Sequence, residues 1–407
     1  MKDPLEEVQV AETPRSGTAF LVLMILGLVL LGAVVPGSRT PLIIVAGIVV
    51  MVMLHELGHF VMARRSGMKA TEFYLGFGRP KLFSFRKGET EFGVKPIVLG
   101  GYVRIVGMTN LEEVDPADES RTFRQGSYRN RLEVILAGVT MNFLLAFVLF
   151  FVVIAGQGQV SEGPSTTIRT VVADSAARAA GLQVGDRLVS VAGARIRDWD
   201  QLVSIIQDHP GTTLRLVVDR HGRRVELTAT PREENGVGFL GVSPRTTYRS
   251  VGFFEAIPES FNTMGKVLTG TGQAFEHVPD VFTGLDKVGT PAPTSGPGAQ
   301  RSLERPRSIV GIVDVGSQIA GNVWGMLALL GIVSFSLGLI NLLPVLPFDG
   351  GHAAVVLFEW IASKVRRRRI RVDYQKLLPV TYAFMVLFLA FAVSTILLDV
   401  RDAIGGS

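Results

Sequence analysis

The residues best suited to chemistry in this sequence are two histidines and a glutamate in the segment HELGH at residues 55–59. Residues four apart lie on one face of a helix, so the imidazoles of His55 and His59 can both direct a nitrogen at one metal ion about 2 Å away. Glu56 would lie about 100° round the helix, close enough to hold a water molecule without being a ligand. This pattern is typical of a zinc site with a glutamate as general base.

A third ligand must come from elsewhere, and it cannot be a thiolate because the chain has no cysteine. Asp349, in the segment NLLPVLPFDGGH at residues 341–352, is the strongest candidate. Two prolines and two glycines there break a helix and can turn the carboxylate inward. His55, His59 and Asp349 would leave the fourth position of a catalytic zinc ion to water. His352 is a weaker alternative ligand, and Asp349 could instead merely cap the following helix.

These residues lie in an unusually apolar chain of 407 residues, 47% hydrophobic and 19% charged, which excludes disorder and argues against a cytosolic enzyme. A membrane span needs about 20 apolar residues. The segment before the HELGH motif becomes long enough only if the motif itself lies in the bilayer. Buried charges there cost a few kcal/mol unless they pair or coordinate, and a zinc ion would provide that compensation.

Depth in the membrane links the two motifs. Counted from the outer end of its helix, His55 lies about 21 Å into a hydrocarbon core of about 30 Å, in the cytoplasmic half. Asp349 lies at the cytoplasmic end of another span that runs in the same direction. We therefore expect the carboxylate and the imidazoles to meet at one depth.

Orientation follows from the basic loops, including the four-arginine run at residues 366–369, which the positive-inside rule places in the cytoplasm. This reading accounts for the net charge of +5 without nucleic-acid binding, and the arginine run would also touch anionic lipid. The predicted organisation is a polytopic α-helical membrane protein with a cytoplasmic tail (1–18), five transmembrane helices (19–38, 41–64, 132–157, 315–352 and 377–398), a glycine-punctuated segment of short strands (70–110), a cytoplasmic connector (111–131), an extracytoplasmic β-rich domain (162–246) and an extracytoplasmic linker with an amphipathic segment (247–314).

Residues 70–110 read as short strands with turns that enter a cavity between the helices, because non-helical backbone beside a membrane must be buried in protein or line a wet cavity. The alternative is a cytoplasmic hairpin. Within residues 162–246, the spacing predicts strands at 168–172, 188–191, 214–219 and 225–230, the last two joined through His221 and Gly222. It also predicts a short helix at 175–180 and a helix at 199–208 capped by Asp198. Residues 289–299 read as a flexible linker.

Taken together, these motifs resemble the site-2 protease family of intramembrane zinc metalloproteases, in particular the bacterial members with a PDZ domain. The resemblance covers almost the whole chain after about residue 41. Besides the two motifs above, it rests on GFG at 76–78, GETEFGVKPIVLGGYVRIVGM at 88–108, Gly138 followed by Asn142, and SAARAAGLQVGDRLVSVAG at 175–193.

The resemblance implies that His55, His59 and Asp349 bind Zn²⁺, that Glu56 is catalytic and that Asn341 helps to bind substrate. It also implies that residues 70–110 are a membrane-reentrant β-loop whose open edge an unwound substrate helix can join as a strand. Residues 162–246 would be a PDZ domain that binds a carboxyl-terminal or other peptide ligand and acts as a size filter.

The implied function is hydrolysis of peptide bonds in the transmembrane segments of single-span membrane proteins, such as anti-sigma factors or remnant signal peptides. The partners would be such a substrate and the lipid bilayer of a bacterial plasma membrane, with the amino terminus cytoplasmic, the PDZ domain extracytoplasmic and no nucleic acid. Two alternatives are a PDZ membrane adaptor with a structural metal, and a transporter with a proton relay, although no internal repeat supports the latter.

The sequence departs from the family pattern at three places. Pro347 falls one residue late in its motif, Val139 replaces a proline that usually follows Gly138, and the span at 19–38 is additional to a common four-helix plan. These departures affect the local shape of the loop and of one helix, and the role of the additional span stays open.

Overall fold

The structure is a computed structural model that describes residues 15–35, 37–160, 165–234, 237–245, 248–283, 306–319 and 321–405. The chain forms two compact units. The first contains the described residues up to Phe150 together with 263–268 and 312–393, and the second contains the remainder. Most of the predicted tail at 1–18 and the predicted linker at 289–299 lie outside the described residues.

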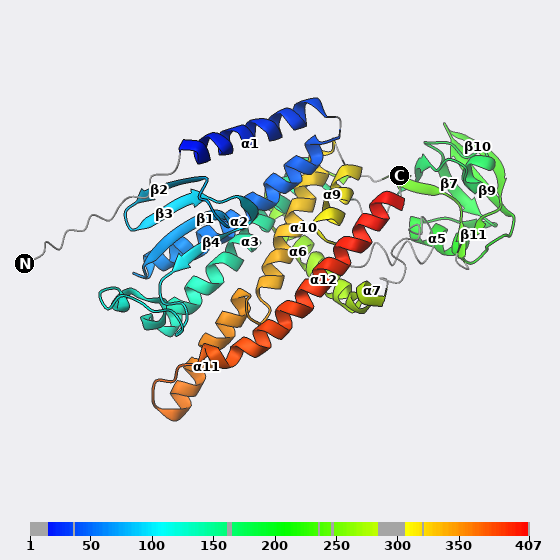
Figure 1. Cartoon of the computed structure of the whole chain (residues 1–407). Coiled ribbons are helices and arrows are strands. Elements are labelled where there is room, and N and C mark those ends of the chain that lie inside the picture. The colour runs from blue at the N-terminus through cyan, green and yellow to red at the C-terminus, as the bar shows by residue number, and fades with distance from the viewer. Residues whose placement is uncertain are drawn as a thin grey trace, which may run out of the picture. The chain divides into compact units, whose positions relative to one another are not determined.

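Long helices dominate the first unit (Figure 1). They are α1 (Arg15–Val34), α2 (Arg39–Arg65), α3 (Tyr128–Gln157), α9 (Ile309–Gln318), α10 (Val323–Asn341), α11 (Asp349–Arg366) and α12 (Leu378–Gly405). Among the described residues, four segments are long and apolar enough to cross a membrane: Arg39–Arg65, Tyr128–Gln157, Val323–Asn341 and Tyr374–Arg401. The chain is therefore a polytopic helical membrane protein. Many side chains of α1 lie outside the described residues, so a fifth crossing stays a prediction.

The predicted transmembrane segment over residues 315–352 contains two helix breaks: the one at the prolines was predicted, and the earlier one, between α9 and α10, corrects the prediction. α9 ends at Gln318, and Asn322 begins α10 by accepting a hydrogen bond from the backbone N–H of Gly325 at 3.1 Å. Gly321, between the two helices, has a left-handed φ of 84° that favours glycine. α10 then ends at Asn341, and turns occupy residues 342–348 before α11. The continuous apolar run concealed the first of these two breaks.

A four-stranded sheet packs beside α2. Its strands are β1 (Ala70–Phe77), β2 (Phe83–Lys87), β3 (Thr90–Val94) and β4 (Ile97–Ile105), in the order β2-β3-β1-β4. β1 pairs parallel with β3 and antiparallel with β4, which forms one edge. The ring of Phe60 on α2 lies 5.6 Å from Phe73 and 5.5 Å from Phe92, so aromatic packing joins the helix to one face of the sheet. The predicted short strands are thus present.

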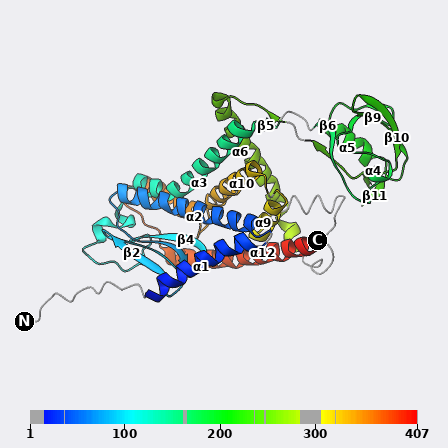
Figure 2. The ribbon, with the colours of Figure 1, turned by 90° about the horizontal axis from the view of Figure 1, so that it is seen from above.

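The core beneath this sheet joins α2, β4, α3 and α11 through Ala63, Ile105, Phe123, Val134 and Val356. Two short 3-10 helices, η1 (Glu119–Arg121) and η2 (Phe123–Gln125), lead from the sheet into α3. α2 and α3 run side by side, as Figure 2 shows from above. Their contact positions the candidate site.

The second unit contains a sheet of six strands: β6 (Ser165–Val171), β7 (Arg187–Val191), β8 (Ala194–Arg195), β9 (Leu214–Arg220), β10 (Arg223–Ala229) and β13 (Val242–Arg245). α4 (Ala176–Ala179) and α5 (Trp199–Gln207) pack on its aliphatic core. Asp198 caps α5 through the backbone N–H of Gln201, as predicted, and His221 with Gly222 forms the predicted turn between β9 and β10. This domain, within the predicted boundaries 162–246, is α+β.

The remaining elements of the second unit are short strands and two helices. β11 (Arg232–Glu234) pairs with β12 (Val237–Phe239), and β5 (Gln159–Val160) pairs with β14 (Tyr248–Arg249). α6 (Phe253–Glu276) and α7 (Val278–Thr283) follow in the segment predicted to be partly amphipathic.

Candidate active site

Three candidate ligand atoms converge between α2 and the start of α11. Nε2 of His55 lies 3.1 Å from Nε2 of His59, and Oδ2 of Asp349 lies 3.1 and 3.3 Å from these two nitrogen atoms. Both histidines are only 7% exposed. Oδ2 of Asp349 is buried, yet it has no hydrogen-bond partner among the described residues. The two motifs, almost 300 residues apart in sequence, therefore meet at one point.

This arrangement fits a zinc ion. Tetrahedral coordination with bonds of about 2.0 Å separates neighbouring ligand atoms by about 3.3 Å, close to the three separations above. A buried carboxylate oxygen without a donor is costly unless a cation satisfies it. Two imidazoles and one carboxylate also form a ligand set that zinc accepts in catalytic sites.

A tight turn presents Asp349 to the histidines. Turns at residues 342–348 fold back against the start of α11, where the backbone N–H of Gly351 donates to the carbonyl of Phe348 at 3.0 Å. A Cβ atom at Gly350 would lie 2.1 Å from the carbonyl oxygen of Leu342, and one at Gly351 would lie 2.4 Å from the nitrogen of Leu346. Both glycines are therefore needed for this close return of the chain.

α3 orients both imidazoles from behind. Nδ1 of His59 lies 2.8 Å from the carbonyl oxygen of Val134, so it is the protonated nitrogen and Nε2 is left free for a metal. Nδ1 of His55 lies 3.2 Å from the side-chain amide of Asn142, whose Oδ1 is buried without a partner. With the amide turned by 180°, Oδ1 would accept the Nδ1–H of His55, which also leaves its Nε2 free.

Glycines allow this approach of the helices. A Cβ atom at Gly138 on α3 would lie 2.3 Å from Nε2 of His59 and 2.8 Å from Cε1 of His55. A Cβ atom at Gly58 on α2 would lie 2.5 Å from the carbonyl oxygen of Ala137. Because real Cβ atoms do not approach so closely, neither position accepts a side chain without displacing the site.

Glu56 points from α2 toward β4. Its Oε2 accepts a hydrogen bond of 3.0 Å from the backbone N–H of Val103. A Cβ atom at Gly101 would lie 3.4 Å from Cγ of Glu56 and 2.9 Å from Sδ of Met53, so the strand can approach the helix here because it carries a glycine. The carboxylate is thus held at the edge strand, next in sequence to one candidate ligand and three residues from the other.

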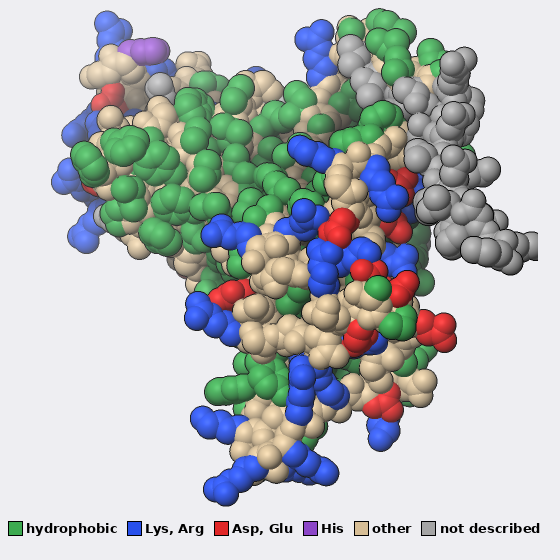
Figure 3. Space-filling view, turned by 90° about the vertical axis from the view of Figure 1, so that its left-hand side faces the viewer, with side chains coloured by type: hydrophobic (Ala, Val, Ile, Leu, Met, Phe, Trp, Pro, Cys, Tyr) green, Lys and Arg blue, Asp and Glu red, His purple; other side chains and the backbone are tan. Residues whose placement is uncertain are grey.

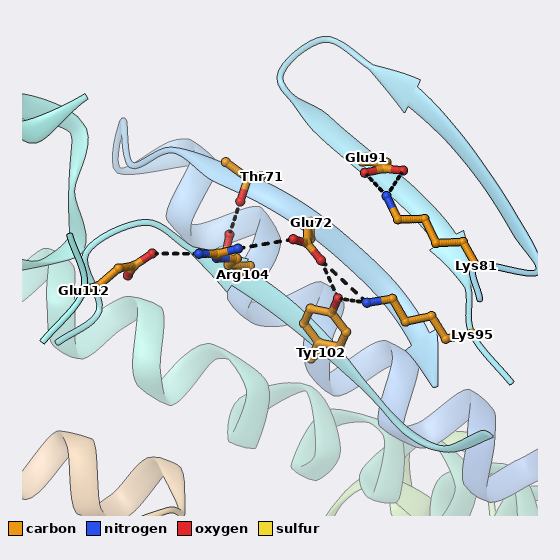
Figure 4. Close-up of polar contacts among 8 residues, drawn as sticks. All are labelled: Thr71, Glu72, Lys81, Glu91, Lys95, Tyr102, Arg104 and Glu112. Atoms are coloured by element: carbon orange, nitrogen blue, oxygen red, sulfur yellow. Dashed lines mark hydrogen bonds and ion pairs between the residues drawn. The ribbon is translucent and has the colours of Figure 1, made fainter. Parts of the chain in front are cut away.

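The face of the sheet opposite α2 carries a polar network (Figure 4). Glu72 accepts hydrogen bonds from the hydroxyl of Tyr102 and, at 3.4 Å, from Arg104. Nζ of Lys95 donates to the hydroxyl of Tyr102 at 2.5 Å. Burial, followed by the bond to Glu72, raises the pKa of Tyr102, so the tyrosine stays neutral and donates. The network fixes the register of β4 against β1 from the side away from Glu56.

Two other candidates are not members of this ligand group. Asn341 is half-buried as the last residue of α10, and its part in substrate binding stays a prediction. His352 lies on α11 with Nδ1 3.4 Å from the hydroxyl of Tyr374, and it is not one of the three grouped ligands.

Gly138 and Asn142 were part of the predicted family resemblance, but they were not predicted to be site residues. Asn142 is fully buried, and its carbonyl oxygen accepts a hydrogen bond of 2.9 Å from Ser334 on α10, which ties a third helix to the histidines. A signal was available, because an amide within a membrane span needs a polar partner. A glycine four residues before it would have marked the face of close helix contact.

Comparisons with known proteins identify the family of this chain. The profile of Peptidase family M50 matches residues 43–388. The zinc metalloprotease Rip1 of Mycobacterium tuberculosis is 33% identical over 401 residues, which cover 88% of this chain and 96% of that protein. The zinc metalloprotease RasP of Geobacillus kaustophilus is 26% identical over 423 residues, covering 86% and 93% respectively. The matched region contains both candidate motifs.

Proposed function

The chain belongs to peptidase family M50 and is a zinc-dependent intramembrane endopeptidase, and on this premise we propose that His55, His59 and Asp349 hold its zinc ion. The observation that carries the assignment is the unpartnered, buried Oδ2 of Asp349 within 3.3 Å of both Nε2 atoms. A cation between these three atoms would compensate for the burial of this oxygen.

Glu56 is the general base in this proposal. A bound zinc ion supplies Lewis acidity, which polarises a carbonyl group and makes water nucleophilic near neutral pH. Glu56 takes the proton of the attacking water and delivers it to the leaving amine. The N–H of Val103 holds Oε2 in place, which leaves Oε1 to receive the proton. Burial of both imidazoles keeps bulk water from competing for the ligand atoms.

The outer edge of β4 is the proposed docking place for the substrate. Helical carbonyl groups are hydrogen-bonded, so a transmembrane substrate must unwind before hydrolysis. The unwound segment can regain hydrogen bonds by adding as a strand to an open edge. β4 is an edge strand whose Val103 already contacts Glu56, so a segment along this edge would run past the general base. Asn341 would help to hold that segment.

The domain at 162–246 is proposed to be a PDZ domain, supported by its six-stranded sheet with two packed helices. It would bind a carboxyl-terminal or other peptide ligand and admit only substrates of suitable size. We further propose that the amino terminus is cytoplasmic and this domain extracytoplasmic, because the basic segments flanking the spans favour that orientation.

A membrane adaptor with a structural metal would need a closed site with a fourth protein ligand. Among the described residues, the group holds three His, Cys, Asp or Glu ligands, and Glu56 lies beside it, bonded to Val103. Three ligands and an adjacent carboxylate favour the enzyme.

The decisive experiment compares wild type with Glu56→Gln and Asp349→Ala in cleavage of a single-span membrane substrate, together with zinc analysis. We expect Glu56→Gln to keep its zinc and lose at least about 10²-fold in cleavage rate, since general base catalysis contributes at least that much. Asp349→Ala should lose both zinc and cleavage. If Glu56→Gln cleaved the substrate at the wild-type rate, Glu56 would not be the general base. If Asp349→Ala kept its full zinc content, Asp349 would not be a zinc ligand.

A further inference from the structure

A pocket of about 270 Å³ lies where the segments around η2, the start of α3 and the end of α11 meet. Four arginines line it, with one acidic residue: Arg124, Arg131, Arg369, Arg371 and Glu359. Neutral donors line it as well, including the amides of Asn110 and Gln125. Such an excess of guanidinium groups in one hollow needs counter-charge.

Two of the four arginines are neutralised by protein carboxylates. Arg131 donates to Glu359 at 2.6 Å, and both side chains are 2% exposed. Nε of Arg124 donates to Glu119 at 3.0 Å, and this pairing, with a bond from Gln125, lowers the pKa of Glu119 to about 2. Each carboxylate has a further donor, so neither is left to serve another arginine.

The other two arginines are not neutralised in this way. Among the described residues, no carboxylate lies within ion-pair distance of Arg369 or Arg371. Burial, and then the nearby charges of Arg131 and Arg369, lower the pKa of Arg371, and the charge of Glu359, which raises it, does not outweigh them. Nε of Arg131 is buried without a hydrogen-bond partner among the described residues. Positive charge and an unused donor therefore remain at the pocket.

We propose that this pocket binds a phosphate group. Guanidinium groups match phosphate oxygens with paired hydrogen bonds, and Arg369, Arg371 and the unused Nε of Arg131 line this pocket. The positive-inside rule places the pocket at the cytoplasmic membrane surface, where basic pockets between helices bind anionic headgroups. A phospholipid headgroup and a free phosphate share this chemistry.

The test uses the full-length protein in neutral detergent and native mass spectrometry, with phosphatidylglycerol, phosphatidylcholine or inorganic phosphate added separately. Wild type should retain phosphatidylglycerol at least about fivefold better than phosphatidylcholine. Arg371→Gln and Arg369→Gln should each reduce that retention about fivefold. Arg368→Gln, an exposed neighbour outside the pocket lining, is the matched control and should behave as wild type. Unchanged substrate cleavage and thermal unfolding would verify that the variants fold.

The two sources of phosphate give different results. If the lipids bind equally but inorganic phosphate binds and is lost in Arg371→Gln, the site takes a soluble phosphate, which also supports the proposal. The proposal is overturned if wild type shows neither lipid preference nor phosphate binding. It is also overturned if Arg368→Gln reduces binding as much as the two pocket variants do.

Discussion

The proposed metal centre of the first unit and the α+β domain of the second bury different kinds of side chain. The domain buries aliphatic residues such as Leu188, Leu202 and Leu216, whose stabilisation depends on the apolar area removed from water. The metal centre buries His55 and Asn142, whose value depends on which atoms they face. The domain should therefore lose stability in proportion to lost packing, whereas the centre should lose function from a shift of a single atom.

Figure 3 shows a different division, among the surface side chains on one face of the molecule. Hydrophobic side chains gather in one area, and Lys and Arg side chains, with Asp and Glu among them, gather in another. A chain that lies partly in lipid must separate its surfaces in this way.

The largest expected effect comes from Gly138→Ala, which adds a methyl group 2.3 Å from Nε2 of His59. The imidazole must move, and a displacement of about 1 Å at a catalytic group can cost about 10²-fold in rate. Cleavage and zinc content should both fall. Gly270→Ala is the control, because a Cβ atom there meets nothing within 4 Å. If Gly138→Ala cleaved the substrate at the wild-type rate, the imidazoles could move without loss of function, which would contradict the comparison.

Leu202→Ala tests the domain side of the comparison. Leu202 is fully buried on α5, so its truncation should destabilise the domain by about 2–5 kcal/mol. Hydrogen exchange of the β7 and β9 amides in the full-length protein should accelerate accordingly, while zinc content stays at the wild-type level. Loss of zinc in this variant would contradict the separation drawn here.

Asn142→Ala should have an intermediate effect on the metal centre. Without the amide, Nδ1 of His55 loses its partner, and such orienting contacts are worth about 10- to 100-fold in metal affinity. Competition with a chelator measures this affinity. If Asn142→Ala binds zinc as tightly as wild type, the imidazole is oriented by packing alone.

The smallest effect concerns pH and the α+β domain. Burial raises the pKa of Asp186, but hydrogen bonds from Arg220 and from the backbone N–H of Gln183 outweigh it, so the net pKa is lowered. A lowered folded-state pKa stabilises the domain above the ordinary value near 3.9, and this contribution is lost as pH falls below it. Hydrogen exchange should show the domain losing stability between about pH 5 and pH 3. Asp186→Asn should flatten that dependence; an unchanged profile would exclude Asp186 as its source.

Local patterns were sufficient for many, but not all, of the elements of both units. The HELGH spacing predicted a helix with two histidines on one face, and α2 has that form. The apolar pattern predicted the strands β6, β7, β9 and β10, and Asp198 marked the start of α5. Helix breaks at Gly321 and Asn322 were missed, because the mean apolar character of residues 315–348 outweighed two local signals.

The sequence by itself determined the chemistry available to this protein, because residue types and their spacing along one helix settle which atoms can bind a metal. The tertiary structure alone decided which carbonyl and amide stand behind the imidazoles, and that Val103 holds Glu56. It also decided that Arg369 and Arg371 share a hollow with two arginines already paired. The reason is physical: these contacts join distant segments through the packing of α2, α3, α11 and β4, and packing depends on the whole fold rather than on any single window of sequence.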